Sequence, residues 1–233
     1  MNTVCVIPVR GGSKGIPRKN LLPVAGKPLV VWTIEQALAV PGLRVIVSTE
    51  DAEIAEVSRA AGAEVIDRPV ELAQDTTASE PVIEHVIATL TERGERPDAV
   101  MFLQATSPVR LPGTLARALA EFEASGADSM VAVVAETPFL WNLGHPATAD
   151  YDFTRRPRRQ DIAPDAMKYR ENGSLYVTRT EIYETVHNRL GGHIELFVLD
   201  EVEASDIDTP ADRDRAESVL RRLTETKADR LDR

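Results

Sequence analysis

Residues 10–20 combine three glycines with four cationic side chains in one short loop. The apolar run before them, residues 4–9, is typical of a buried strand. Glycine lets the backbone turn its N–H groups toward an anion, and Arg10, Lys14 and Lys19 place positive charge at short spacing. Such a loop at the carboxyl end of a first strand predicts a polyphosphate site. The alternative is a solvated basic loop, which would not require glycines at the strand end.

This loop differs from the two common phosphate-binding motifs. Its sequence matches neither GxxxxGK[ST] nor the GxGxxG dinucleotide fingerprint. The difference argues against the usual kinases, ATPases and dehydrogenases.

A late acidic pair, Asp206 and Asp208, is the second candidate for chemistry. Aspartates at i and i+2 of an extended chain point the same way, so both can face one cation. Mg²⁺ takes one or two carboxylates and completes its octahedron with water and phosphate oxygens. The alternative is complementation of the following helix dipole. Phosphate-binding cations with a two-carboxylate metal site, and no evident nucleophile–base pair, predict nucleotidyl transfer.

Charge and cysteine content restrict the partners and the location. Lys and Arg number 27 and Asp and Glu 37, so the net charge is −10, which argues against nucleic-acid and anionic-membrane partners. The single cysteine, Cys5, lies in the first apolar run and is expected to be a reduced core residue. No run of about 18 apolar residues is present, and the first residues do not read as a signal peptide. We therefore expect a cytoplasmic protein without a membrane partner.

Apolar runs alternate with amphipathic helical patterns, which predicts an α/β fold with an open, mostly parallel, doubly wound (Rossmann-like) sheet flanked by helices. After the first strand, further strands are expected at 43–49, 64–67, 98–104, 129–134, 173–178 and 194–199. The helical patterns cover 28–40, 51–61, 82–90, 115–122 and a stretch from Thr209-Pro210 to about 223.

The alternation stops at about residue 137, which divides the chain into parts. We expect a catalytic domain at 1–136 and 168–223, an inserted irregular arm at 137–167, and a frayed charged tail at 224–233. The arm is rich in proline and arginine, which favours contact with a second subunit. Ligands of open α/β sheets bind beyond the carboxyl ends of the strands, so the loops 10–20, 68–79 and 104–107 should converge there.

Six segments, taken in order, resemble the acylneuraminate cytidylyltransferases, the CMP-sialic acid synthetases. They are IPVRGGSKGIPRKN at 7–20, VSTED at 47–51, RP at 68–69 with ELAQDT at 71–76, LQATSP at 103–108, NGSLY at 172–176 and SDIDT at 205–209. The resemblance covers about residues 3–222. It implies a nucleotide-binding α/β domain, a dimerisation arm and hence a homodimer, Mg²⁺ dependence, and CTP as the donor.

The resemblance also implies roles for individual residues. The nucleotide would be bound by Arg10, Gly11, Gly12, Ser13, Lys14, Lys19, Asn20, Arg68 and Ser79. The catalytic residues would be Arg10, Lys14 and Lys19, with Lys19 stabilising charge at the α-phosphoryl group. Asp206 and Asp208 would bind Mg²⁺. The acceptor would face Gln104, Arg159, Arg170, Asn172 and Tyr176, although Gln104 and Tyr176 could be ordinary strand-end and core residues and Arg159 part of a surface patch.

The acceptor side departs from the sialic-acid pattern. Residues 137–141, TPFLW, stand where those enzymes tend to place a histidine, proline and lysine set, and the stretch 159–172 is longer. The acceptor implied by the family is a small acid, typically a 2-keto-3-deoxy sugar acid. A small phosphonate such as phosphonoformate is the alternative. Sugar-1-phosphate nucleotidyl transfer and a non-catalytic nucleotide-binding module are the other functions to be distinguished.

Overall fold

A seven-stranded mixed sheet forms the centre of the molecule, with the strand order β11-β7-β10-β6-β1-β4-β5. The structure is a computed structural model, which describes residues 1–12 and 15–231 and, in the last helix, side chains as far as Glu225. Six strands run in the same direction, and β10 runs antiparallel to both of its neighbours. The strands are β1 Thr3–Pro8, β4 Arg44–Thr49, β5 Glu64–Asp67, β6 Ala99–Leu103, β7 Ser129–Glu136, β10 Lys168–Arg179 and β11 Ile194–Leu199. The predicted α/β class with a mostly parallel sheet is confirmed.

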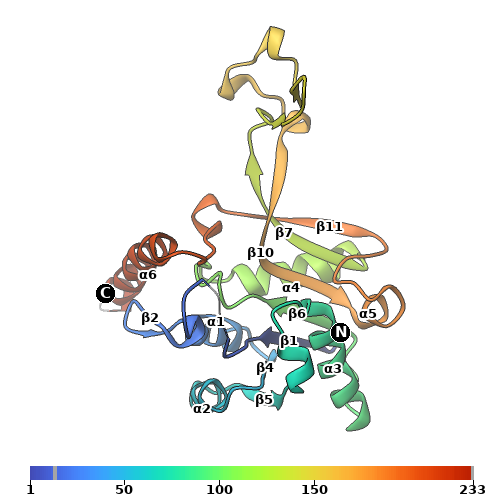
Figure 1. Cartoon of the computed structure of the whole chain (residues 1–233), viewed down its shortest axis with the longest axis vertical. Helices are drawn as coiled ribbons and strands as arrows, with labels where there is room; N and C mark the ends of the chain where they lie inside the picture. Colours follow the sequence, from blue (N-terminus) through green and yellow to red (C-terminus); the bar gives the residue numbers. More distant parts are fainter. Residues whose placement is uncertain (13–14, 232–233) are drawn as a thin grey trace.

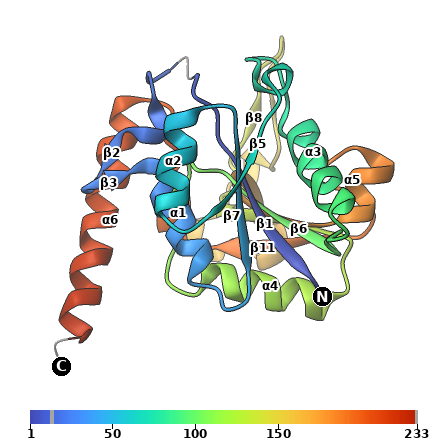
Figure 2. The same cartoon turned by 90° about the horizontal axis from the view of Figure 1, so that it is seen from below.

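Helices cover both faces of this sheet, so the domain has three layers (Figure 2). One core joins alternate strand residues to α1 Leu29–Leu38, α2 Ala52–Ala60 and α4 Thr114–Ser125. A second core, on the opposite face, joins the intervening strand residues to α3 Ser79–Glu92 and α5 Thr180–Val186. Cys5 is a free, buried thiol in the first core.

Three elements differ from the sequence prediction. The last helix, expected to end at about 223 before a frayed tail, continues as helix to Leu231. The strand expected at 173–178 begins at Lys168, because its ladder with β7 continues beyond a register shift between Glu171 and Tyr176. Helix α5 was not predicted, since seven residues are too few to show a clear helical period.

Residues 137–167 leave the sheet between β7 and β10 and project from it as an arm (Figure 1). The arm holds a small hairpin of β8 Trp141–Asn142 and β9 Thr148–Ala149, followed by the 3-10 turns η3 Phe153–Arg155, η4 Arg159–Asp161 and η5 Pro164–Ala166. Its own packing is a small aromatic group in which Tyr151 meets Phe139 and Trp141 edge-on. Much apolar surface stays open, with Trp141 54% and Phe153 60% exposed.

The last helix, α6 Pro210–Leu231, packs through a third, smaller core against the first loop and the hairpin of β2 Pro23–Val24 and β3 Lys27–Pro28. Thr209 and Asp212 bond reciprocally at its start: the Asp212 carboxylate accepts from the Thr209 N–H at 2.7 Å, and the Asp212 N–H donates to Thr209 Oγ1 at 3.3 Å. The remaining short turns are η1 Lys19–Leu21, η2 Val70–Ala73 and η6 Glu201–Glu203. Among the helices described, none has the length and apolar content needed to cross a membrane.

Candidate active site

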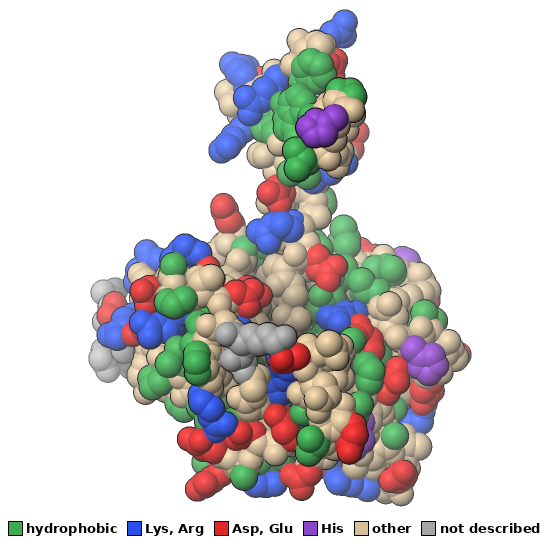
Figure 3. Space-filling model, viewed as in Figure 1, with side chains coloured by type: hydrophobic (Ala, Val, Ile, Leu, Met, Phe, Trp, Pro, Cys, Tyr) green, Lys and Arg blue, Asp and Glu red, His purple; other side chains and the backbone are tan. Residues whose placement is uncertain are grey.

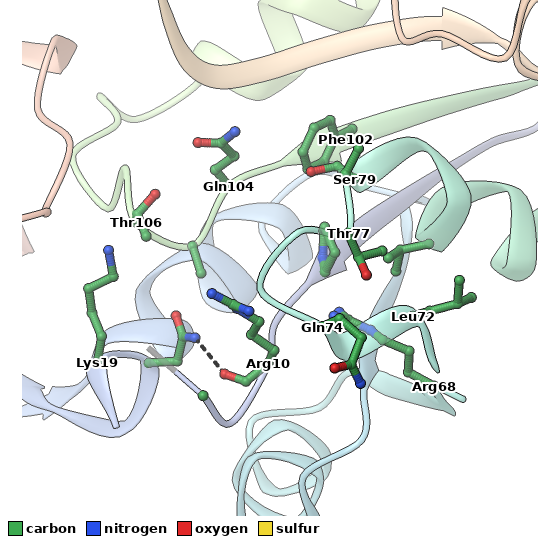
Figure 4. Close-up of a pocket in the computed structure, with 16 residues that line it drawn as sticks. Arg10, Lys19, Arg68, Leu72, Gln74, Thr77, Ser79, Phe102, Gln104 and Thr106 are labelled. Carbon is green, nitrogen blue, oxygen red and sulfur yellow. Dashed lines mark hydrogen bonds between the residues drawn. The ribbon is translucent and has the colours of Figure 1, made fainter. Parts of the chain in front are cut away.

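A cavity of about 260 Å³ opens where β1, β5 and β6 end. Three loops line it, the ones that the sequence analysis expected to converge (Figure 4). Seven residues with a predicted binding role face it: Arg10, Gly12, Lys19, Asn20, Arg68, Ser79 and Gln104. Gln74, Thr77, Phe102 and Thr106 also line it, although the sequence analysis gave them no role. Ser13 and Lys14 lie outside the described residues.

Arg10 contacts two of the loops around the cavity, the segment after β5 and the first loop. Its Nη1 lies 2.7 Å from Oδ1 of Asp75, on the segment that follows β5. Its backbone carbonyl accepts a hydrogen bond of 3.1 Å from Nδ2 of Asn20. Asn20 therefore secures the backbone of the loop, and Asp75 orients the guanidinium. The sequence analysis gave Asp75 no role, although it lies in one of the quoted segments.

The acidic residues that follow β4 bind the loop 10–20 through hydrogen bonds and ion pairs. Glu50 Oε1 accepts the Gly11 N–H at 2.8 Å. A Cβ on Gly11 would lie 2.3 Å from Oδ2 of Asp51, so any larger residue here would force the Asp51 side chain to move. Arg18, with a left-handed φ of 54°, pairs with Asp51 and Glu53, and this guanidinium lowers the pKa of Asp51. The amide of Gly11 is thus used inside the protein, a role that the motif alone does not reveal.

Asp51 also positions the helix behind the loop. Its Oδ1 accepts the backbone N–H of Ile54 at 2.9 Å and so caps the first turn of α2. Asp51 therefore caps the helix, binds the Arg18 side chain and limits the space beside the Cα of Gly11. The sequence does carry a signal for this role: Asp51 follows a predicted strand and lies three residues before the apolar Ile54 of the next helix, which is the position of a helix cap.

Lys19 meets the acidic pair at the other end of the cavity. Its Nζ donates to the carbonyl of Ile207 at 2.7 Å and lies 3.2 Å from Oδ1 of Asp208. The Lys19 side chain is 12% exposed and that of Asp208 74% exposed. The Ile207 N–H donates to the carbonyl of Thr106 at 2.8 Å, which fastens this segment to the loop after β6.

Asp206 fits the role of a cation ligand. Its Oδ1 is buried and accepts no hydrogen bond from any residue that the structure describes. Burial raises the pKa of Asp206, and the charge of Asp208 adds to the shift, while Thr106 and Lys19 oppose it. A metal ion is one partner that can satisfy a buried carboxylate oxygen without a donor. Within the described residues no group of three or more His, Cys, Asp or Glu side chains is placed to hold a metal, so the pair would need ligand or water oxygens to complete the coordination.

Arg68 is a buried cation beneath the loop. It donates to the carbonyls of Val9, at 3.2 Å, and Ser48, and its Nε lies 3.4 Å from Ser48 Oγ. Burial lowers the pKa of Arg68 to about 10, so it stays charged at neutral pH. The side chain ties the ends of β1 and β4 together and lines the cavity at the same time.

The five predicted acceptor residues do not all lie together. Gln104 lines the cavity. Tyr176 is buried in the second core, where it stacks on Phe102 with ring centroids 5.4 Å apart and donates its hydroxyl to Glu171. The Asn172 carboxamide accepts from the Ser174 N–H at 3.1 Å and so shapes the turn within β10.

Arg170 and Arg159 belong to the arm side of the molecule. Arg170 Nε lies 3.0 Å from Glu136 Oε2, where β7 and β10 enter the arm. Arg159 is exposed in η4, on the arm itself (Figure 1). Within the single chain, neither residue lines the cavity.

The arrangement has the parts needed to bind a polyphosphate beside a divalent cation. Arg10 and Lys19 are separate positive charges on one cavity wall, and α3 begins at the cavity with Ser79. Positive side chains and helix N-termini both stabilise anions. The described lining of the cavity contains no Cys, His, Asp or Glu.

Comparison with known proteins gives a consistent result. A family model described as Cytidylyltransferase matches residues 4–201. The chain is 33% identical over 223 residues to N-acylneuraminate cytidylyltransferase B of Danio rerio, a match that covers 93% of this chain and 51% of that protein. It is 30% identical over 229 residues to a pseudaminic acid cytidylyltransferase of Campylobacter jejuni, covering 95% and 97%. The chain thus spans about half the length of the Danio rerio relative.

Two solved structures share the fold. A CMP:2-keto-3-deoxy-manno-octonic acid synthetase complexed with CTP superposes with a TM-score of 0.68 at 19% identity, over 94% of this chain and 98% of that one. A 4-diphosphocytidyl-2C-methyl-D-erythritol synthase from Anaerococcus prevotii gives 0.64 at 8% identity, with the same coverage.

Proposed function

Because the chain belongs to the cytidylyltransferase family, we propose that it transfers CMP from CTP to a hydroxyl of an acidic acceptor and releases pyrophosphate. The observation that carries this proposal is the meeting of the glycine-rich loop with the acidic pair at Lys19. That meeting would put the cation-binding carboxylates beside a cavity that is lined by the phosphate-binding cations. A non-catalytic module would have no need for both.

The residues would divide the reaction between them. The acceptor oxygen attacks the α-phosphorus, the bond from that phosphorus to the bridging oxygen breaks, and pyrophosphate departs with the electron pair. Lys19 would stabilise the negative charge that grows on the phosphoryl and bridging oxygens. Arg10 would hold the phosphates, together with Ser13 and Lys14, which remain predictions from the sequence. Gly12, Asn20, Arg68 and Ser79 would complete the nucleotide site.

A divalent cation, which we propose to be Mg²⁺, would be held by Asp206 and Asp208. When bound it would neutralise phosphate oxygens and orient them. The buried, donor-free oxygen of Asp206 supports this assignment.

For the acceptor we propose a 2-keto-3-deoxy sugar acid of the sialic-acid type. The relatives from Danio rerio and Campylobacter jejuni carry the names of such acids, N-acylneuraminate and pseudaminic acid. Gln104 would contact the acid from the cavity wall. No feature of the fold favours a small phosphonate, which stays an outcome of the assay below.

We further propose that the protein is a homodimer joined through its arm. Figure 3 shows hydrophobic side chains gathered along the arm and Lys and Arg side chains beside them. The edge strand β11 adds a row of three half-exposed apolar residues, Ile194, Leu196 and Val198. Arg159, which does not reach the cavity of its own chain, would contact an acceptor only in the cavity of a partner. The cytoplasmic location remains a prediction from the sequence.

The test is an assay of pyrophosphate release with CTP, Mg²⁺ and a panel of acids. The panel contains sialic, legionaminic, pseudaminic and octulosonic acids and simple phosphonates, with ATP, GTP and UTP as control nucleotides. We expect turnover with CTP and at least one sugar acid. Product with phosphonates alone would replace the sugar acid by a phosphonate, and no product from CTP with any acid would overturn the proposal.

A further inference from the structure

Arg110 is a buried arginine in the segment between β6 and α4, with 4% of its surface exposed. Its Nη1 donates to Thr33 Oγ1 at 3.2 Å and to Gln36 Oε1 at 3.0 Å, both on α1. Its Nη2 donates to the carbonyls of Gln104 at 3.1 Å and Ser174 at 2.8 Å. One guanidinium therefore joins a helix to the end of β6 and to the middle of β10, where its register shifts.

Among the residues that the structure describes, the Arg110 guanidinium has no charged partner in contact with it. All four acceptors are neutral, and no carboxylate in the described part of the chain lies within 4.0 Å of the guanidinium. Burial lowers the pKa of Arg110 to about 10, so the side chain is still a cation at neutral pH. The nearby buried Glu203 uses Oε1 to accept from the Leu111 N–H and the Thr114 hydroxyl, each at 2.8 Å. A buried cation without a contacting carboxylate costs desolvation free energy, which the hydrogen bonds to these four acceptors offset.

The two carbonyls bound by Arg110 belong to the segments that shape the Gln104 side chain. Gln104 lines the cavity between Thr106 and Phe102 (Figure 4). Gly173, next to Ser174, has a φ of 74°, and a Cβ there would lie 2.8 Å from Oε1 of Gln104. The carboxamide therefore packs directly over a bare Cα. The position of the Gln104 carboxamide therefore depends on the spacing between β6 and β10. The Arg110 guanidinium holds this spacing by bonding the carbonyls of Gln104 and Ser174.

We propose that Arg110 is a positioning residue for the acceptor: by holding both strands it keeps the Gln104 carboxamide directed into the cavity. The inference rests on the proposed function, in which Gln104 contacts the sugar acid. Arg110 does not line the cavity itself, so its effect on the acceptor passes through Gln104.

Arg110→Lys is the informative variant, because it keeps the charge and loses the planar fork, whose Nη1 reaches α1 while its Nη2 reaches the two carbonyls. We expect the acceptor KM to rise about 10-fold, while the Kd for CTP, measured by calorimetry, changes less than about 2-fold. In a Gln104→Ala background the same substitution should add little, since the group being positioned is gone. A loss of folded protein would lower the apparent kcat and leave both constants unchanged.

Thr180→Val is the matched control for lost stability. Its buried hydroxyl donates to the carbonyl of Pro97 at 2.8 Å, just after β10 ends and at the other end of that strand from the arm. We expect a lower unfolding midpoint with an unchanged acceptor KM. If Arg110→Lys does not fold, Thr33→Val decides the question, because it removes one acceptor of the guanidinium with little change of side-chain shape, whereas Gln36 also donates to the carbonyl of Pro108.

The outcomes separate this inference from the proposed function. A raised acceptor KM that vanishes in the Gln104→Ala background supports it. An unchanged acceptor KM in folded Arg110→Lys, or in Thr33→Val if the former is unfolded, overturns it and leaves the cytidylyltransferase proposal standing. Wild-type protein that uses no acid from the panel overturns both.

Discussion

Lys19 and Asp208, 189 positions apart in the sequence, form an ion pair of 3.2 Å at the end of the cavity. Each has a second predicted partner: a phosphate for the ammonium and a metal ion for the carboxylate. While the ion pair is formed, Lys19 is not free to bind a phosphate and Asp208 is not free to bind a metal ion. Binding of the cation and of the nucleotide should therefore be coupled, because a metal on Asp208 releases Lys19.

Asp208→Asn tests this coupling. We expect CTP to bind the variant about 3-fold more tightly than wild type in the absence of divalent cations, a small gain because Asp208 is largely exposed. Added Mg²⁺ should then improve CTP binding less than it does in wild type. Titration calorimetry with and without Mg²⁺ measures both effects. Asp214→Asn, which removes an exposed carboxylate paired with Arg213, is the control, and equal behaviour of the two variants would contradict the coupling.

Lys19→Ala should abolish most turnover without unfolding the protein. Removing a charge that acts on the developing negative charge costs about 100- to 1000-fold in kcat. Pyrophosphate release measures the rate, and circular dichroism follows the folded fraction. Lys27→Ala is the control, because this lysine pairs with Glu35 and lies over Trp32 outside the cavity. A Lys19→Ala variant as active as wild type would refute the assignment.

The adjacent glycines of the first loop should respond differently to alanine. Gly11→Ala forces a Cβ against the Asp51 carboxylate and should lower the free energy of unfolding by about 1–3 kcal/mol, with CTP affinity reduced about 10-fold. At Gly12 a Cβ would meet no heavy atom within 4 Å, so Gly12→Ala should change the free energy of unfolding by about 0.5 kcal/mol or less. Urea unfolding and calorimetry with CTP check both. Equal destabilisation by the two substitutions would show that the contact with Asp51 does not restrict this position.

The buried thiol predicts a dependence of stability on alkaline pH. Burial raises the pKa of Cys5 to about 12, whereas an unfolded thiol titrates at about 8.5. Between these values the native state keeps a proton that the unfolded state has lost, so the free energy of unfolding falls as pH rises. The stability difference between wild type and Cys5→Ala should therefore shrink by about 2 kcal/mol from pH 8 to pH 10. Urea unfolding at several pH values measures it, and a constant difference would contradict the prediction.

Polar substitutions in the arm should weaken the proposed dimer. Trp141→Ser combined with Phe153→Ser removes two exposed aromatic side chains of the arm. We expect a shift toward the monomer in size-exclusion chromatography with light scattering. Val70→Ser, another exposed apolar position, lies in η2 outside the arm and should leave the mass unchanged. A wild-type protein that is monomeric at all concentrations would refute the homodimer.

Local patterns were enough to predict most of the fold. The strand at 64–67 has the predicted bounds, because its apolar run is short and clearly delimited. Helix α5 and the early start of β10 could not be predicted in the same way. Both depend on neighbours distant in sequence: α5 on packing against α3, and the first residues of β10 on the ladder with β7.

For the site, the sequence indicated which loops would meet but not how each side chain would be used. Arg68 and Tyr176 illustrate the limit. Arg68 donates hydrogen bonds to the carbonyls of two strands and also lines the cavity. Tyr176 is buried against Phe102. Nothing in the residue types separates such contacts from contacts with a ligand.

The sequence by itself determined the alternation of strands and helices, the glycine-rich basic loop at the first strand end and the acidic pair before the last helix. These are local properties, set by the spacing of apolar, glycine and charged residues. The tertiary structure alone decided that Lys19 meets Asp208, that Gly11 packs on Asp51, and that Arg110 fastens Gln104 to β10. Such pairs depend on strand order and on close packing between distant segments, and neither is encoded in any short stretch of the chain.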